Sequence, residues 1–272
     1  MNSQTALTSV VTASMLEEFK FLKFSFELFH GAEYRWFVRC DLASQRALSG
    51  YHNIVCRGFT DRVTERPDIE SKEFKTIVSE KMNAMDDAWR AGNWANVIFF
   101  DADIIITAPL MDSISAVEGD VVLTPNYYPD TTKHLAVIHG YYNTGFVCAR
   151  DSRFHRWWQD ACKSQPQKWT DQGCMNDAHK KFVVGTLSDR ANIGFWRSTR
   201  IPEFDPITPD CEFLHAHLFQ PLLTPRQWVD KAFALHCLKY LRRSQITEHG
   251  RLLQEALARD ESRWYEASLR LS

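Results

Sequence analysis

Short apolar runs of the length of buried strands alternate along the chain with segments whose apolar residues recur at helical spacing. Residues 96–100 (NVIFF) form such a run, as expected of a strand covered on both faces of a parallel sheet. The preceding segment, residues 73–91, has the periodicity of a helix and is followed by Gly92. This alternation predicts an α/β layered fold with a mixed, mainly parallel sheet flanked by helices.

The same patterns predict further elements on either side. We expect strands at residues 8–13, 34–38, 53–56, 120–123 and 145–149, and helices at residues 15–29 and 152–163. After Pro225 the chain changes to two amphipathic segments rich in Lys and Arg, at about residues 226–243 and 247–269. We therefore predict one α/β domain over residues 1–225 and a C-terminal helical extension over residues 226–272.

Length and composition are those of an ordinary globular protein. A chain of 272 residues can bury one substantial core, and 44% hydrophobic with 24% charged residues argue against wholesale disorder. The formal net charge of -2 lacks the basic character of nucleic-acid-binding proteins. No apolar run reaches the roughly 18 residues that a membrane-spanning helix requires.

The N-terminal residues and the cysteines favour a cytoplasmic protein. Residues 1–11 lack a basic start followed by an apolar run, so we expect no secretory signal. The seven cysteines form no CxxC pair, which indicates reduced thiols rather than disulfides or a cysteine zinc site.

Two carboxylates stand where the central apolar run ends. Asp101 and Asp103 follow Phe100, and the ligand crevice of open α/β sheets lies at the carboxyl ends of the strands. Side chains two apart share one face of an extended chain, so both carboxylates could bind one cation. Their hard oxygens suit Mg²⁺ or Mn²⁺, which would neutralise a departing diphosphate. The alternative, a strand cap or a turn, is disfavoured because apolar segments flank the two charges on both sides.

Four further motifs accompany this acidic pair. In chain order the five are SEKMNAM at 79–85, IFFDADI at 98–104, YNTGF at 142–146, WTDQ at 169–172 and FLHAHL at 213–218. In this order they resemble the motifs of nucleotide-diphospho-sugar transferases of the GT-A type, and among them glycosyltransferase families 8 and 77. The resemblance covers roughly residues 8–221 and implies a Rossmann-like GT-A fold. It also implies a nucleoside-diphosphate sugar as the donor, with UDP as the expected nucleotide.

The resemblance implies roles for individual residues. Mn²⁺ or Mg²⁺ would be held by Asp101, Asp103 and one of the two histidines His215 and His217. The residues expected at the nucleotide are Lys81, Thr12, Ala13, Asp101, Ala102 and Gly145, and the catalytic residues expected around the sugar are Asn143, Asp171 and Gln172. For Asp171 three roles stay open, namely orienting the donor, acting as a general base and stabilising positive charge.

Most of these residues also have an ordinary structural interpretation. Lys81 could be a solvated lysine on a helix surface, and residues 143–145 a plain turn. Asp171 or Thr170 could cap a helix. A late HxxGxxKPW pattern of one similar family is missing, because the chain reads HLFQP at 217–221, which leaves the lysine contacts to the diphosphate open.

We therefore expect a metal-dependent glycosyltransferase that acts on a hydroxyl of a glycan, a lipid-linked molecule or a small molecule, with retention preferred over inversion. A phosphatase of the haloacid dehalogenase type also uses a DxD motif, but places it near the start of its domain. A sugar nucleotidyltransferase would carry a Gly-rich loop after its first strand, and residues 10–15 (VVTASM) contain no glycine. A sugar-binding relative without activity is a further alternative. The basic C-terminal helices would allow peripheral contact with an acidic lipid surface.

Overall fold

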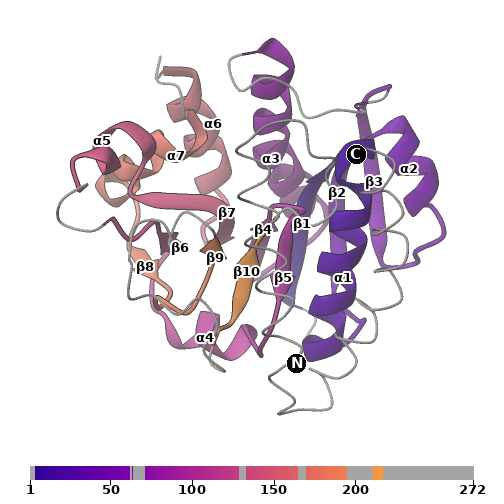
Figure 1. Cartoon of the computed structure of the whole chain (residues 1–272), viewed down its shortest axis with the longest axis horizontal. Coiled ribbons are helices and arrows are strands. Elements are labelled where there is room, and N and C mark those ends of the chain that lie inside the picture. Colours follow the sequence, from indigo (N-terminus) through magenta and orange to yellow (C-terminus); the bar gives the residue numbers. More distant parts are fainter. Residues whose placement is uncertain are drawn as a thin grey trace, which may run out of the picture.

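A seven-stranded sheet forms the centre of the protein (Figure 1). The computed structural model describes residues 4–61, 63, 71–128, 133–164, 170–194 and 211–216. The strands lie in the order β3 (Ile54–Thr60), β2 (Arg35–Asp41), β1 (Thr5–Val11), β4 (Asn96–Phe100), β7 (Tyr142–Ala149), β6 (Val121–Pro125) and β8 (Val184–Thr186). Strand β7 is antiparallel to both of its neighbours, and the other pairs are parallel. The predicted mixed, mainly parallel sheet is confirmed.

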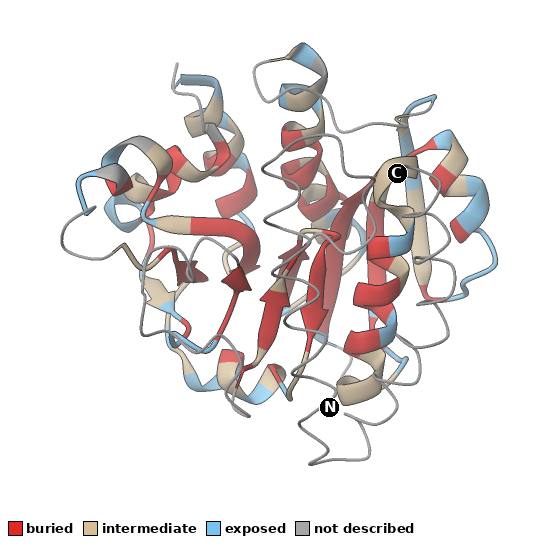
Figure 2. Ribbon diagram, in the orientation of Figure 1, coloured by how far each residue is buried: buried red, intermediate tan, exposed pale blue. Residues whose placement is uncertain are grey.

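Alternate residues of each central strand pack into two separate apolar layers. Val97 and Phe99 of β4 face a layer that contains helices α3 (Lys72–Ala91) and α6 (Phe154–Ser164) and the 3₁₀ segment η4 (Cys174–Lys180). Ile98 and Phe100 face the opposite layer, which contains helix α1 (Leu16–His30). The central strands are therefore buried on both sides, as the red ribbons of Figure 2 show.

A second, three-stranded sheet covers part of the α1 layer. It consists of β5 (Ile104–Ile106), β10 (Phe213–His215) and β9 (Ile193–Gly194), in that order. Strand β10 is antiparallel to β5 and parallel to β9. The smaller elements are η2 (Ala13–Met15), α2 (Leu42–Leu48), α4 (Met111–Ala116), α5 (Leu135–His139) and α7 (Thr170–Gly173).

Several of the predicted boundaries are wrong, and the strands expected at residues 34–38 and 53–56 continue to Asp41 and Thr60. The first strand was expected at residues 8–13, but it spans Thr5–Val11 because Thr5 and Ala6 pair with the start of β4, and the chain then turns into η2. Residues 143–145 were considered as a turn, but they lie within β7. The strand Asn96–Phe100 and the end of α3 at Ala91 agree with the predictions.

Some predictions fall on parts of the chain that the structure leaves undescribed. The C-terminal extension at 226–272, His217 and Trp169 lie outside the described residues. Within the described ranges, no helix has the length and apolar character needed to cross a lipid bilayer.

Candidate active site

The carboxyl ends of the parallel strands β1, β2 and β4 meet at one edge of the sheet. Asp41, the last residue of β2, is fully buried there and accepts three backbone hydrogen bonds at 2.8 Å, from Ala13, Ser44 and Val63. Burial alone would raise the pKa of Asp41, but these hydrogen bonds lower it below its usual value. The carboxylate thereby holds the turn after β1, where Thr12 and Ala13 were predicted to contact the nucleotide.

Asp101 and Asp103 lie in a tight turn that follows β4. The backbone N–H of Ile104 donates to the carbonyl oxygen of Asp101 at 3.2 Å and closes the turn, while the N–H of Asp101 donates to the carbonyl oxygen of Gly145 at 2.8 Å. The two carboxylates were expected to share a face of an extended chain, which is wrong. The turn is what brings both carboxylates to the same point.

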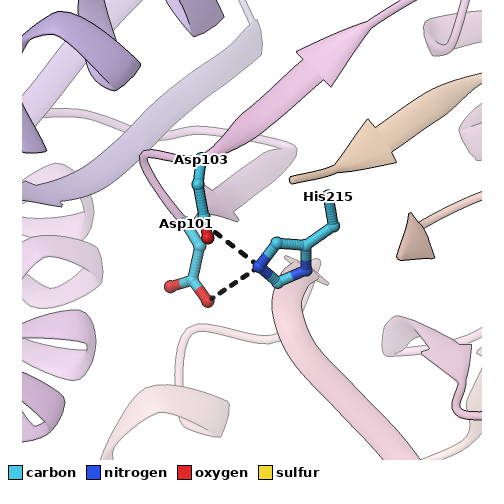
Figure 3. A group of neighbouring side chains, drawn as sticks. All are labelled: Asp101, Asp103 and His215. Carbon is cyan, nitrogen blue, oxygen red and sulfur yellow. Dashed lines mark ion pairs between the residues drawn. The ribbon is translucent and has the colours of Figure 1, made fainter. Parts of the chain in front are cut away.

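His215 reaches this point from the second sheet. It ends β10 and pairs across the antiparallel ladder with Ile104, directly after the acidic turn. The N–H of Ala216 also donates to the carbonyl oxygen of Asp103 at 2.9 Å. As a result, Nε2 of His215 lies 3.2 Å from Oδ1 of Asp103 and 3.9 Å from Oδ2 of Asp101. Figure 3 shows the imidazole ring directed between the two carboxylates.

The residues at this point fit a divalent cation. One ligand atom from each of Asp101, Asp103 and His215 lies within 4.8 Å of the other two. Ligand atoms about 2.1 Å from an octahedral cation lie about 3 Å from one another, and the separation of His215 and Asp103 is of that size. Carboxylates with one imidazole form a common donor set for such ions. Burial raises the pKa of Asp101, Lys81 opposes this, and Asp103 adds to the rise, so a cation would relieve the repulsion between the carboxylates.

Lys81 bridges two acidic residues of the site. It lies on α3, is only 8% exposed, and places Nζ 2.9 Å from Oδ1 of Asp101 and 3.1 Å from Oδ2 of Asp171. Burial alone would lower the pKa of Lys81, but Asp101 and Asp171 together raise it. Lys81 is therefore a buried cation of the site, and the interpretation as a solvated surface lysine is wrong.

Asp171 is held in place at the start of α7. Its Oδ2 accepts a hydrogen bond from the hydroxyl of Thr144 at 2.8 Å besides its pair with Lys81. The indole N–H of Trp158 donates to the carbonyl oxygen of Asp171 at 3.0 Å. The next residue, Gln172, accepts a hydrogen bond from Nδ2 of Asn126 at 3.2 Å. The WTDQ motif thus places Asp171 beside the acidic pair through Lys81, while Gln172 contacts Asn126.

Residues 143–145 bring β7 against the histidine. Gly145 is in close contact with His215, since a β-carbon added to it would lie 2.4 Å from Cε1 of the ring. Asn143 is 7% exposed, and its Oδ1 accepts from the N–H of Gly145 and from Nδ2 of Asn192, each at 2.8 Å. Ala102 is buried in the apolar layer that contains α1, so only its backbone remains for a contact with a nucleotide.

Three further residues hold the site together, of which Thr144 belongs to the YNTGF motif while Asn126 and Asn192 belong to none of the five motifs. Thr144 binds Asp171, Asn126 binds Gln172, and Asn192 binds both Asn143 and His215. Asn192 has a left-handed backbone with φ of 56°, a conformation that Asn tolerates better than most residues. The choice of Asn at this position is therefore explained by the backbone conformation, and nothing in the sequence around residue 192 indicates a functional site.

The comparisons with known proteins concern the family and the fold of the chain. A sequence model of the nucleotide-diphospho-sugar transferase family matches residues 37–238, which is more than half of the chain. No curated protein is similar enough in sequence to match.

Three solved structures are similar in fold. They are the bifunctional glycosyltransferase WbbM in its apo form (TM-score 0.54, 11% identity), the glycosyltransferase GlyE of Streptococcus pneumoniae TIGR4 (0.52, 12%) and the galactosyltransferase LgtC in complex with donor and acceptor sugar analogs (0.57, 14%). The similarity covers 94%, 94% and 91% of this chain, and 52%, 64% and 99% of the respective proteins. The chain thus spans about half of WbbM and less than two thirds of GlyE. Identities this low show a common fold of the GT-A type and no more.

Proposed function

Because the chain belongs to the family of nucleotide-diphospho-sugar transferases, we propose that it is a metal-dependent glycosyltransferase that moves a sugar from UDP to an acceptor hydroxyl. The observation that carries this proposal is the convergence of Asp101, Asp103 and His215 at the carboxyl edge of the sheet. Besides the pairs that Asp101 forms with Lys81 and Asp103 with His215, the two carboxylates and the imidazole form a donor set that suits one divalent cation. The expected acceptors are a glycan, a lipid-linked molecule or a small molecule in the cytoplasm.

A divalent cation bound by Asp101, Asp103 and His215 would act as a Lewis acid for the diphosphate leaving group. Lys81 adds a fixed positive charge to the same region, because Nζ is held by Asp101 and Asp171. Its buried ammonium group would favour the negative charge of a diphosphate more strongly than a solvated lysine, since burial lowers the effective dielectric constant.

We further propose that the transfer retains the anomeric configuration. Inversion by direct displacement needs a general base for the acceptor hydroxyl. Asp171 is the carboxylate expected near the sugar, and its Oδ2 is bound by Lys81 and Thr144. Both donors occupy Oδ2 and hold the carboxylate in one orientation, so this oxygen is already engaged and is not left to accept a proton from an acceptor hydroxyl. Asp171 is better suited to orienting the sugar and stabilising positive charge at the anomeric carbon.

Thermal unfolding tests the donor site. The melting temperature is measured with a panel of nucleoside diphosphates, each with and without Mn²⁺, because a ligand of the native state raises it. We expect a Mn²⁺-dependent increase with UDP that Asp103→Asn abolishes and that the control Asp177→Asn, at a half-buried position, retains. A stable wild-type protein that responds to no nucleotide would contradict the proposed donor site. Binding of UDP without transfer from any UDP-sugar would instead indicate a sugar-binding relative without activity.

The stereochemical proposal has its own test. The anomeric configuration of the first product is read by ¹H NMR before it can mutarotate. Retention of the donor configuration is expected, and an inverted product would contradict the role given to Asp171.

A further inference from the structure

A chain of hydrogen bonds runs from the backbone of β7 to the imidazole ring at the metal site. The N–H of Gly145 lies 2.8 Å from Oδ1 of Asn143. A backbone N–H can only donate, so the atom of Asn143 that faces it must be the carboxamide oxygen. This fixes the orientation of the Asn143 amide, which is otherwise hard to assign because its nitrogen and oxygen have the same shape.

The orientation of Asn143 fixes that of Asn192. An atom of the Asn192 amide lies 2.8 Å from Oδ1 of Asn143, and it must be the donor Nδ2 because the oxygen of Asn143 can only accept. The same Nδ2 lies 2.7 Å from the hydroxyl oxygen of Thr124, which can accept its second proton. Oδ1 of Asn192 therefore points to the remaining neighbour, the ring of His215.

The orientation of Asn192 in turn determines a proton on His215. Nδ1 of the ring lies 3.0 Å from Oδ1 of Asn192, and two acceptors at that distance would repel each other. Nδ1 must therefore carry a proton and donate it. When a cation takes the place of any proton on Nε2, the neutral ring would carry its proton on Nδ1, which is the less common tautomer of imidazole in water. The nitrogen left to face Asp103 and Asp101 is Nε2.

We propose that Asn192 is a positioning residue that holds the proton on Nδ1 of His215 and thereby commits Nε2 to the cation. The proposal extends the proposed function, because it concerns the metal site described there. A ligand histidine in metalloproteins is often oriented by a hydrogen bond from its other ring nitrogen, and such partners tune metal affinity. Asn192 is suited to this role because it is 1% exposed, so water does not compete for its amide.

The proton on Nδ1 can be observed without any metal. In uniformly ¹⁵N-labelled apo protein, we expect a ring N–H signal assigned to Nδ1 of His215 that exchanges slowly with solvent. It should persist when Mg²⁺ is added and disappear in Asn192→Gly, since glycine accepts the left-handed backbone but offers no acceptor. A wild-type ring that shows no protected Nδ1–H, with or without metal, would overturn the proposal. This result does not depend on whether the protein is a transferase.

Binding of Mn²⁺ alone gives the second readout, through the electron paramagnetic resonance signal of the free ion. We expect Asn192→Gly to weaken binding about 10- to 100-fold, the usual effect of removing such a partner. In Asn192→Asp one carboxylate oxygen still accepts from Nδ1 while the other faces Oδ1 of Asn143. This variant should therefore melt at a lower temperature yet keep an affinity close to that of the wild type.

Thr124→Val is the matched control. It removes the second acceptor of the Asn192 amide and the hydroxyl that donates to the carbonyl oxygen of Asn143. The hydrogen bonds of the Asn192 side chain to Asn143 and His215 stay in place. We expect a lower melting temperature with unchanged affinity for Mn²⁺. If the affinity for Mn²⁺ fell in proportion to the melting temperature in all three variants (Asn192→Gly, Asn192→Asp and Thr124→Val), Asn192 would have a structural role only. If wild type bound no Mn²⁺ while the Nδ1–H signal behaved as expected, the metal site would fail but the placement of the proton would stand.

Discussion

His215 lies so close to Gly145 that no other residue fits at position 145 without moving the ring. A β-carbon at Gly145 would lie 2.4 Å from Cε1 and 2.7 Å from Nδ1 of His215, both shorter than contacts that real β-carbons make. The glycine of the YNTGF motif is therefore explained by packing against the histidine at the metal site, besides the contact with the nucleotide that the family resemblance implies.

Gly145→Ala should displace His215 from the acidic turn. We expect the affinity for Mn²⁺ to fall at least about tenfold, as for other disturbances of ligand orientation. The overpacking should also cost about 1–3 kcal/mol of unfolding free energy. Titration calorimetry and chemical denaturation measure the two effects. Gly50→Ala is the control, because a β-carbon there meets no atom within 4 Å. Unchanged Mn²⁺ binding in Gly145→Ala would contradict the importance of this contact.

Lys81→Met should destabilise the apo protein and strengthen its response to metal. The substitution leaves the carboxylates of Asp101 and Asp171 without their shared cation, and breaking such a buried pair costs about 3–5 kcal/mol. Mn²⁺ can replace part of the lost charge, so the increase in melting temperature on adding Mn²⁺ should be larger than in wild type.

Lys23→Met is the matched control for that prediction. Lys23 is equally buried and pairs with Glu27 within α1, away from the acidic turn. We expect a lower melting temperature in this variant but a wild-type increase with Mn²⁺. An equal response to Mn²⁺ in both variants and in wild type would show that Lys81 does not act at the metal site.

The affinity for Mn²⁺ should keep rising with pH above 6.5, the pKa of an ordinary histidine. Burial alone would lower the pKa of His215, but Asp103 raises it above 6.5 overall. A proton on Nε2 competes with the metal, so the affinity should increase about tenfold per pH unit below the raised pKa and level off above it. Mn²⁺ binding isotherms measured at pH values from about 5.5 to about 8.5 would show where the rise in affinity ends. A plateau that begins below pH 6.5 would contradict the predicted direction.

Asp41→Asn should loosen the turn after β1. An amide keeps a single acceptor oxygen, so its NH₂ group would face at least one of the backbone N–H groups of Ala13, Ser44 and Val63. We expect a loss of about 2–3 kcal/mol of unfolding free energy, the cost of one or two unsatisfied buried donors. The affinity for UDP should fall while the affinity for Mn²⁺ alone stays the same. Asp177→Asn, at a half-buried position where the carboxylate pairs with Lys180, should change neither quantity.

Elements whose residues carry their own signal could be predicted from the sequence. The apolar run at Asn96–Phe100 predicted the bounds of β4, and Gly92 predicted the end of α3 at Ala91. The start of β1 could not be predicted in this way, because Thr5 and Ala6 are in the strand through their pairing with Asn96 and Val97. Pairing between distant segments decided the boundary, and one chain read alone does not reveal it.

The proximity of Asp101 and Asp103 could be predicted from the sequence, although the geometry given as its reason is wrong. The motif placed Asp101 and Asp103 at the end of a strand, whereas the convergence of their carboxylates depends on a turn. Asn192 could not be predicted at all. Its partners His215, Asn143 and Thr124 are 23, 49 and 68 positions away in the chain, and they meet only when the two sheets pack together.

The position of β10 has a consequence for the order of events during synthesis. The two carboxylates of the site leave the ribosome long before His215, which arrives with the last described strand. A nascent chain that has folded its central sheet therefore carries an acidic turn but lacks the imidazole that completes the donor set. We therefore expect full affinity for a cation only once β10 has paired with β5, so that metal binding would report the formation of the last strand among the described residues.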